Sequence, residues 1–284
     1  MESAFDLGAY MDRIGLVNTA DPSLATLHAV VTAHCAAIPY ENIGILLGTP
    51  PKLDLESLQT KMVQQRRGGY CFEQNLLLRA ALRALGFSAT GLIARVVRGF
   101  PADAPRAAAH MAIRVDLLEG PYLVDVGFGN LTPTAPLELR PDIVQATPHE
   151  PMRLLPVHSE LVLQARLGNE WENLWRLCAH EVLDIDYDIA SWFTATHPTS
   201  LFRNNMIVAC AQAGGMRCTF LNGRVNIRRP DGTVDRRDLA GDADAIANAL
   251  MGTFGLDVPI ADIQAGVATL ARLGQAGAPH RFFS

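Results

Sequence analysis

A glycine pair followed by a cysteine, at the point where a helical pattern begins, constrains this chain more than any other feature. The stretch covers residues 67–75 and reads RGGYCFEQN. Beyond it, apolar side chains recur at spacings of three and four residues until Gly86, so we expect a helix that begins at Cys71. A thiol in the first turn of a helix lies near unpaired backbone N–H groups, which favour a thiolate. The adjacent Arg66 and Arg67 add positive charge.

Cys71 also has a purely structural interpretation, because free cysteine is among the most buried residue types. A nucleophilic cysteine needs a base, and the base needs a group that orients it. Of the eight histidines, His110 is the best candidate for that base, since it opens an alternating run at residues 109–117 that predicts a half-buried strand. The other histidines lie in helical, proline-rich or terminal segments, or lack a clear carboxylate partner.

A carboxylate follows in the next predicted strand. Residues 122–126 are apolar apart from Asp125, and residues 119–121 mark a turn between the two strands. A lone carboxylate in such a strand is costly to bury unless it finds hydrogen-bond donors, and an imidazole N–H is one suitable donor. His110 and Asp125 are therefore candidate partners.

The local pattern alone does not bring these two side chains together. A hairpin that turns at Glu119 and Gly120 would place Asp125 opposite Arg114, with His110 about 13 Å further along the strand. A cross-strand pair between Arg114 and Asp125 is the alternative that this register predicts. A bulge, a wide loop or barrel curvature would be needed to bring His110 to Asp125.

Several blocks of the sequence resemble the arylamine N-acetyltransferases. They are residues 10–15 (YMDRIG), 38–43 (IPYENI), 67–75 (RGGYCFEQN), 109–111 (AHM) and 124–129 (VDVGFG). The order of cysteine, histidine and aspartate along the chain also fits that family. The resemblance covers the whole chain, although its motifs become sparse after residue 129.

The resemblance implies a catalytic triad of Cys71, His110 and Asp125. It also implies an α+β multidomain fold, with an N-terminal helical bundle, a central antiparallel β-barrel and a C-terminal α/β lid around a cysteine-protease-like catalytic core. The catalytic site would lie between the first two domains. The sequence departs from the family pattern at Tyr40, where many members carry phenylalanine, and at Ala109, where several carry threonine.

The chain divides into three parts by pattern, and we expect domain boundaries at 1–86, 87–190 and 191–284. Helices are predicted at residues 6–16, 23–38, 53–65, 71–85, 242–254 and 259–273. Strands are predicted at residues 91–97, 109–117, 122–126, 159–165, 173–182, 218–220, 225–229 and 233–238. The dipeptides Asn222-Gly223 and Asp231-Gly232 predict two tight hairpins. Residues 133–156 are rich in proline and predict a long irregular connection.

Composition narrows the class of protein. A formal net charge of −5 gives no basic stripe for nucleic acid. Residues 1–6 lack the basic start and apolar core of a signal peptide, and no apolar run reaches membrane-spanning length. The five cysteines show no Cys-x-x-Cys spacing, which favours reduced thiols over disulfides or zinc. We therefore expect a cytoplasmic enzyme without a metal and without nucleic-acid or membrane partners.

The residues that would bind substrate are suggested by glycines beside the second strand. Phe128 lies between Gly127 and Gly129, so its ring is expected to face a cavity, and the glycines allow a ligand to approach the backbone. The resemblance implies acyl-donor and acceptor contacts here, which makes Phe128 and Gly129 candidates. Tyr40 and Phe202 are candidates for further aromatic walls. Backbone N–H groups, that of Cys71 among them, would hold the oxyanion.

Arginines gather around the two predicted hairpins at residues 224–237. Their simplest interpretation is a solvated meander with charged faces. The alternative is that some of them bind the phosphates of coenzyme A, because the donor must place its pantetheine near Cys71 and its charged end towards solvent.

The resemblance implies transfer of an acetyl group from acetyl-CoA, as co-substrate, to aromatic amines and hydrazines, without a metal or prosthetic group. In this ping-pong scheme Cys71 attacks the thioester, CoA leaves, and the amine takes the acetyl group from the cysteine. His110 would form an ion pair with Cys71 and move protons, while Asp125 would fix the imidazole tautomer.

Two other classes of function stay open. A thiol hydrolase or transglutaminase-like enzyme could use the same three residues on an amide and would release ammonia from a glutamine side chain. A non-catalytic binding module on the same scaffold would leave Cys71 unreactive. The physiological acceptor, the acyl-chain preference and the oligomeric state, including a homo-oligomer, also stay open.

Overall fold

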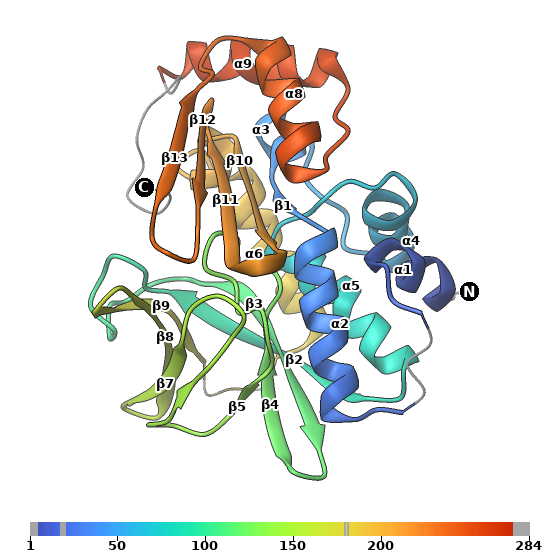
Figure 1. The fold of residues 1–284 in the computed structure, drawn as a ribbon, viewed down its shortest axis with the longest axis vertical. Coiled ribbons are helices and arrows are strands. Elements are labelled where there is room, and N and C mark those ends of the chain that lie inside the picture. Colours follow the sequence, from blue (N-terminus) through green and yellow to red (C-terminus); the bar gives the residue numbers. More distant parts are fainter. Residues whose placement is uncertain (1–4, 18–20, 179, 181, 275–284) are drawn as a thin grey trace.

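The computed structural model describes residues 5–17, 21–178, 180 and 182–274. In this part of the chain, helices from the first third pack beside an eight-stranded antiparallel sheet, and a five-stranded antiparallel sheet carries the last two helices (Figure 1). None of the helices described here is long and apolar enough to cross a membrane.

The N-terminal helices begin where the sequence places side-chain caps. Asp6 accepts a hydrogen bond from Ala9 N, and Ser23 accepts one from Thr26 N. The helices are α1 (Leu7–Ile14), α2 (Leu24–Ala37), α3 (Ile43–Leu46), α4 (Leu55–Gln59), which continues as a π-helical turn (Thr60–Gln64), and α5 (Cys71–Ala84). The predicted helices at 6–16, 23–38 and 71–85 are confirmed, whereas the prediction at 53–65 missed the π-helical turn.

The start of α5 depends on the two glycines that precede it. A Cβ on Gly68 would lie 2.1 Å from the carbonyl oxygen of Pro39, and a Cβ on Gly69 would lie 2.8 Å from the Cβ of Glu73. The Glu73 side chain also accepts a hydrogen bond from Tyr70 N at 3.0 Å, which caps the helix. The glycine pair therefore lets the chain pass close to Pro39 immediately before Cys71.

The eight-stranded sheet has the strand order β5-β4-β3-β2-β9-β8-β7-β6. Its strands are β2 (Ser88–Val96), β3 (Ala108–Leu117), β4 (Gly120–Val124), β5 (Leu137–Glu138), β6 (Val144–Gln145), β7 (Met152–Val157), β8 (Glu160–Leu167) and β9 (Glu170–Leu177). Its core includes Leu123, Leu154, Leu163 and Trp175. The sheet is strongly curved, which gives the nearly closed barrel seen at the lower left of Figure 1.

The prediction of an irregular connection at 133–156 is wrong in part. This segment contains β5, β6 and most of β7, and β7 pairs with β8 along its whole length. Met152 and Leu154 are buried in the alternating pattern of a strand. Pro151 and Pro156 flank this alternating pattern. Because proline argues against a central strand, these two residues led to the prediction of an irregular segment.

The hairpin between β3 and β4 turns one residue earlier than the sequence predicts. Leu117 pairs with Gly120 and Arg114 pairs with Leu123, so the prediction that Arg114 lies opposite Asp125 is wrong. Leu118 and Glu119 form the turn instead, which shifts β4 by two residues relative to β3. Arg114 is exposed and forms an ion pair with Asp116 on its own strand.

The five-stranded sheet has the order β1-β10-β11-β12-β13. Its strands are β1 (Tyr40–Glu41), β10 (Ile207–Gln212), β11 (Met216–Leu221), β12 (Arg224–Arg228) and β13 (Val234–Asp238). The hairpin at Asn222-Gly223 is confirmed, with positive φ angles of 52° and 99° that suit a tight turn, and the hairpin at Asp231-Gly232 is confirmed too. The pairing of β1 with β10 was not predicted from the sequence.

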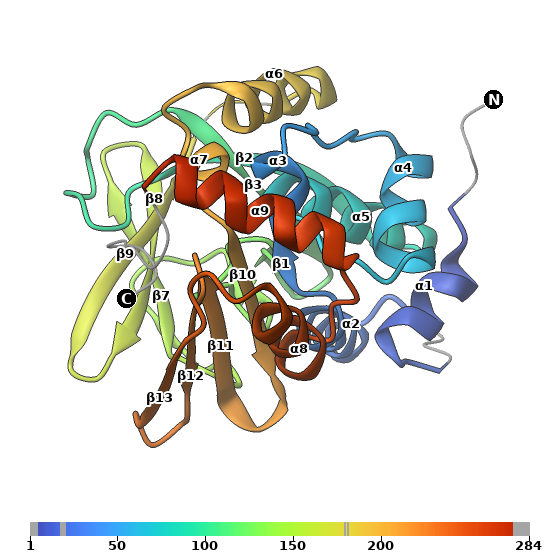
Figure 2. The same ribbon diagram turned by 90° about the horizontal axis from the view of Figure 1, so that it is seen from above.

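Four α-helices and a short 3-10 helix (Ala213–Gly215) complete the described part of the C-terminal half. The α-helices are α6 (Asp184–Thr196), α7 (Leu201–Asn204), α8 (Ala243–Phe254) and α9 (Ile260–Arg272). The predictions at 242–254 and 259–273 are confirmed, and Asp242 caps α8 by accepting a hydrogen bond from Ala245 N. The helix α6 was not predicted. It packs against β3 and α7, on the side of the molecule opposite β12 and β13 (Figure 2).

Candidate active site

Three side chains from separate elements meet where α5 begins. Cys71 is the first residue of α5, His110 lies near the start of β3, and Asp125 follows β4 directly. Nε2 of His110 lies 2.7 Å from Oδ2 of Asp125, and Sγ of Cys71 lies 4.0 Å from the carbonyl oxygen of Ala109, the residue before His110. Exposed fractions of 4%, 2% and 0% show that Cys71, His110 and Asp125 are withdrawn from bulk solvent.

The early turn of the β3–β4 hairpin explains how His110 reaches Asp125. Ile113 pairs with Val124, so the same register continued by one residue would set Asp125 beside Ala112. His110 is then two residues away on the same face of β3, which makes it a diagonal neighbour rather than a residue four positions distant. Side chains at such diagonal positions are within reach of each other.

The groups around His110 raise its pKa above the ordinary value. Burial alone would lower this pKa, but the Asp125 carboxylate and the hydrogen bonds to Asp125 and Cys71 raise it from 6.5 to about 10. His110 is therefore an imidazolium at neutral pH. Since Nε2 faces Asp125, Nδ1 is the ring nitrogen left for Cys71.

The buried carboxylate of Asp125 receives four hydrogen bonds. Oδ1 accepts from Asn75 Nδ2 at 3.0 Å and from Gly127 N at 2.8 Å, while Oδ2 accepts from His110 and from Trp175 Nε1 at 3.1 Å. A buried carboxylate is tolerated only with such compensation. The geometry thus holds Asp125 in one orientation towards the imidazole.

Asn75 and Gly127 join the strands to the cysteine helix. Asn75 donates to the carbonyl oxygens of Met111 at 2.8 Å and Cys71 at 3.2 Å, and accepts from Val126 N at 3.1 Å. A Cβ on Gly127 would lie only 2.7 Å from Cys71 Cα, so this glycine allows the backbone of the strand to approach α5. The sequence interpretation expected a ligand, not a helix, at this position.

A cavity of about 500 Å³ opens beside Cys71. Its lining includes two of the proposed catalytic residues, Cys71 and His110, and all but one of the proposed substrate-binding residues, namely Tyr40, Phe128 and Phe202. The Phe128 ring meets the imidazole edge to face, with 5.3 Å between ring centroids. Further lining comes from Val96, Arg98, Arg106, Ala109, Gly127, Phe193, Thr194, His197 and Leu201, among others.

Gly129 has a different position from the other candidates. It is absent from the cavity lining and has a φ of 82°. A Cβ built on it would lie 3.6 Å from the Tyr40 ring. Gly129 therefore supports the wall that Tyr40 forms, because its backbone lies against that ring.

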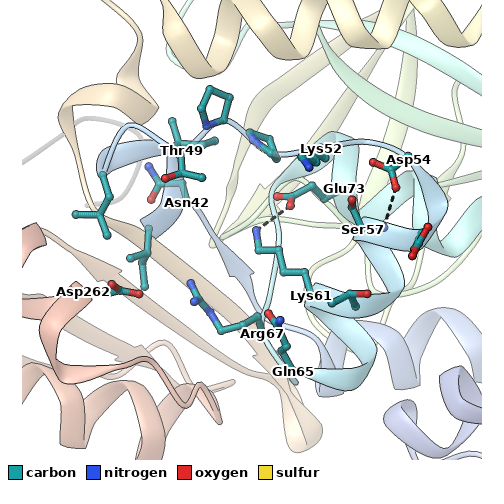
Figure 3. Close-up of a pocket in the computed structure, with 18 residues that line it drawn as sticks. Asn42, Thr49, Lys52, Asp54, Ser57, Lys61, Gln65, Arg67, Glu73 and Asp262 are labelled. Atoms are coloured by element: carbon teal, nitrogen blue, oxygen red, sulfur yellow. Dashed lines mark hydrogen bonds and ion pairs between the residues drawn. The ribbon is translucent and has the colours of Figure 1, made fainter.

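Arg66 and Arg67, whose positive charge was expected beside Cys71, line cavities other than the one that Cys71 lines. Arg67 donates to Glu41 at 2.8 Å and lines a separate, polar cavity of about 740 Å³, shown in Figure 3. Figure 3 also shows Lys61 paired with Glu73 in that cavity. Nζ of Lys61 lies 2.7 Å from Oε1 of Glu73. Arg66 lines a third cavity. The cavity of about 740 Å³ contains ion pairs such as Lys61–Glu73. Cys71 and His110 line the cavity of about 500 Å³ described above, so we place the candidate site there.

Sequence reasoning missed several residues of this site. Trp175 lies on a strand that was predicted only by pattern, and nothing local indicates that its indole reaches Asp125. His197 was set aside because it lacks a carboxylate partner, yet it lines the cavity and its ring stacks on Phe193 at 4.6 Å. Asn75 did carry a signal, because a polar residue on the buried face of a helix needs a partner.

The arginines at 224–237 lie away from this cavity. None of them is among its described lining residues. Arg224 pairs with Asp238 and Arg237 with Asp235, each at 3.5 Å, and Arg228 pairs with Glu150. No group of three potential metal-ligating His, Cys, Asp or Glu side chains occurs among the residues with described positions.

The chain is similar to known proteins over most of its length. A family model described as N-acetyltransferase matches residues 23–263. The arylamine N-acetyltransferase of Mycolicibacterium smegmatis is 39% identical over 272 residues, which cover 93% of this chain and 98% of that protein. The arylamine N-acetyltransferase of Escherichia coli is 35% identical over 252 residues, which cover 89% of both chains.

Solved structures give the same result. The arylamine N-acetyltransferase of Mycobacterium marinum is similar with a TM-score of 0.88 and 38% identity, covering 93% of this chain and 99% of that one. A second structure of that protein, in complex with CoA, has a TM-score of 0.87. The resemblance found in the sequence is confirmed: the chain belongs to the arylamine N-acetyltransferase family.

Proposed function

We propose that this protein transfers the acetyl group of acetyl-CoA to aromatic amines and hydrazines through an acetylated Cys71. The observation that carries the proposal is that Cys71 and His110 line one cavity, with His110 paired to the buried carboxylate of Asp125. Membership of the family and the CoA complex of a relative support acetyl-CoA as the donor.

The first half-reaction uses the ion pair between Cys71 and His110. The Cys71 thiolate attacks the carbonyl carbon of the thioester, and backbone N–H groups at the start of α5, including that of Cys71, stabilise the oxyanion. The bond to the sulfur of CoA then breaks, and His110 gives the departing thiolate its proton. An acetyl-cysteine and neutral His110 result.

The second half-reaction transfers the acetyl group to the acceptor. The amine attacks the acetyl carbonyl, His110 takes the proton that the nitrogen loses, and Cys71 leaves as a thiolate. The ion pair is thereby restored. Asp125 keeps Nε2 of His110 protonated throughout, so that Nδ1 is the nitrogen that exchanges protons with Cys71 and the substrates.

The acceptor would bind against the aromatic walls of the cavity. Its volume of about 500 Å³ suits a small molecule. Tyr40, Phe128 and Phe202 offer ring faces and edges to an aromatic amine, with 6.4 Å between the Tyr40 and Phe202 centroids. Gly129 contributes by supporting Tyr40. A neutral phenol at Tyr40 also supplies a hydrogen-bond donor, because burial and the neighbouring Cys71 raise its pKa well above 10.0.

The finer layout belongs to the same proposal. We assign residues 1–86 to a helical bundle, 87–190 to a β-barrel and 191–284 to an α/β lid around a cysteine-protease-like core. Separate apolar clusters in the barrel and in the C-terminal sheet with its helices support this division. Arginines at 224–237 remain candidates for the phosphates of CoA, and a cytoplasmic location remains a prediction.

Steady-state kinetics test the proposal. Because CoA leaves before the amine reacts, double-reciprocal plots at several concentrations of an aromatic amine should give parallel lines. Intersecting lines would indicate direct transfer in a ternary complex and would contradict the acetyl-cysteine. Release of ammonia from glutamine peptides, without acetyl transfer to amines, would instead identify the thiol hydrolase or transglutaminase-like alternative.

A further inference from the structure

Two other cysteines face each other across the five-stranded sheet. Cys210 on β10 and Cys218 on β11 are direct partners in the register of this antiparallel pair, whose strands lie side by side in Figure 1. Both side chains belong to the apolar cluster under α8 and α9, so they project from the same face of the sheet. Directly opposite residues have Cα atoms about 4.5 to 5.5 Å apart, within the range of about 4.4 to 6.8 Å that disulfides span.

The two thiols already interact with each other, and the interaction is asymmetric. Their hydrogen bond, together with burial, raises the pKa of Cys210 well above its ordinary value of 9.0. The same hydrogen bond lowers the pKa of Cys218 and outweighs its burial, with help from the positive charge of Arg237. The lowered pKa makes Cys218 the more readily ionised of the two sulfurs, and a disulfide forms through attack by an ionised sulfur.

A route for a small reagent reaches this pair. Cys210 is 8% exposed and lines a cavity of about 500 Å³ that is separate from the one beside Cys71. The cavity lies between the end of α8 and the segment after α1, with Gln212, Thr253 and Gly15 in its wall. Cys218 is 1% exposed, so the only accessible approach among the described residues is through Cys210.

We propose that Cys210 and Cys218 are a redox site that forms a reversible disulfide when a peroxide enters this cavity. A thiolate of the pair attacks one peroxide oxygen and breaks the O–O bond, which yields a sulfenic acid and hydroxide. The second sulfur then attacks the sulfenic sulfur, forms the S–S bond and releases water. The two thiols lose two electrons and two protons, and the peroxide is reduced to two waters.

Thiol counting in the Cys71→Ser protein tests this proposal without interference from the nucleophile. That chain keeps four of the five cysteines. After hydrogen peroxide treatment of the native protein, denaturation and labelling with N-ethylmaleimide, two labels should remain instead of four. A digest should contain the peptide of Cys210 linked to that of Cys218, and dithiothreitol should restore all four labels.

Two control variants test whether the disulfide joins Cys210 to Cys218. Cys35 is a matched control because it is equally buried, on α2, with its sulfur 3.7 Å from the carbonyl oxygen of Pro133. Changing Cys35→Ser in the same background should remove one label before and after oxidation and leave the disulfide. Cys218→Ala should abolish the disulfide.

Two results would overturn the proposal, and both come from the Cys71→Ser protein itself. One is four labels after peroxide treatment under conditions that oxidise a free thiol peptide. The other is addition of oxygen atoms to Cys210 without a link to Cys218. Neither result depends on whether the Cys218→Ala variant folds, because the native pair is measured directly.

Discussion

The indole nitrogen of Trp175 donates a hydrogen bond to Asp125, with 3.1 Å between Nε1 and Oδ2. The same carboxylate oxygen lies 2.7 Å from Nε2 of His110. Trp175 is fully buried on β9, and its ring lies 5.7 Å from the imidazole centroid. Trp175 therefore positions the Asp125–His110 pair from the barrel, although it lies far from both residues in the sequence.

Replacing Trp175 by Phe should lower kcat/KM by roughly tenfold. The change removes one hydrogen bond to a charged group, worth about 1.5 to 3 kcal/mol, but keeps an apolar ring in the barrel core. Trp171→Phe on the same strand is the matched control, since Trp171 stacks with Arg153 instead, and it should leave kcat/KM nearly unchanged. Equal rates for the two variants would show that the indole N–H does not support Asp125.

Asp125→Asn should abolish acetyl transfer while the protein stays folded. Asparagine keeps the shape of the side chain but can donate towards the imidazole, which favours the wrong tautomer, so activity should fall by several orders of magnitude. Arg114→Ala should have little effect, because Arg114 is an exposed partner of Asp116. Acetylation rates and thermal melts of both variants measure this. Comparable damage from both changes would contradict the described register.

The His110–Asp125 pair should make stability depend on pH in a defined direction. The pKa of His110 is raised from 6.5 to about 10 in the folded state, so its contribution is fully present below pH 6.5 and is lost as the pH rises to 10. Urea unfolding of wild type and His110→Gln between pH 6 and 10 gives the difference in unfolding free energy. That difference should shrink as the pH increases. A difference that is constant, or that grows, would refute the ion pair.

Gly127→Ala should damage both stability and activity. Its Cβ would press against Cys71 Cα at 2.7 Å, and overpacking of this kind costs about 1 to 3 kcal/mol. Gly252→Ala on α8 is the control, because a Cβ there meets nothing within 4 Å and alanine favours a helix. Chemical unfolding and turnover should separate the two variants. A fully active, stable Gly127→Ala protein would show that the strand does not need this close approach.

The residues in and around α5 made most of this helix predictable from the sequence. The glycine pair, the stop signal at Gly86 and the apolar spacing defined α5 within one residue of its observed end at Ala84. The hairpins at Asn222-Gly223 and Asp231-Gly232 were equally clear, because both depend on residues that tolerate positive φ. In each case a few neighbouring residues determine the conformation.

Features set by contacts between distant segments were harder to predict. Tyr40 pairs with Ala209 because β1 joins a sheet from the other end of the chain, and a strand of two residues has no periodicity to detect. The hairpin before Asp125 turns at Leu118 and Glu119 although Gly120 is the obvious turn residue. The packing of β3 against α5 and the hydrogen bond from Asn75 on α5 to Asp125 favour this register, so local turn chemistry alone gave the wrong partner for Asp125.

Transfer through an acetylated Cys71 involves one covalent event that can be measured directly. Intact-mass analysis after incubation with acetyl-CoA alone should show the addition of one acetyl group, mapped to Cys71 and discharged by an aromatic amine. Cys71→Ser and Cys71→Ala should remain unmodified under the same conditions. An unmodified wild-type protein that still acetylates amines, or acetylation that persists in the Cys71→Ala variant, would contradict the mechanism.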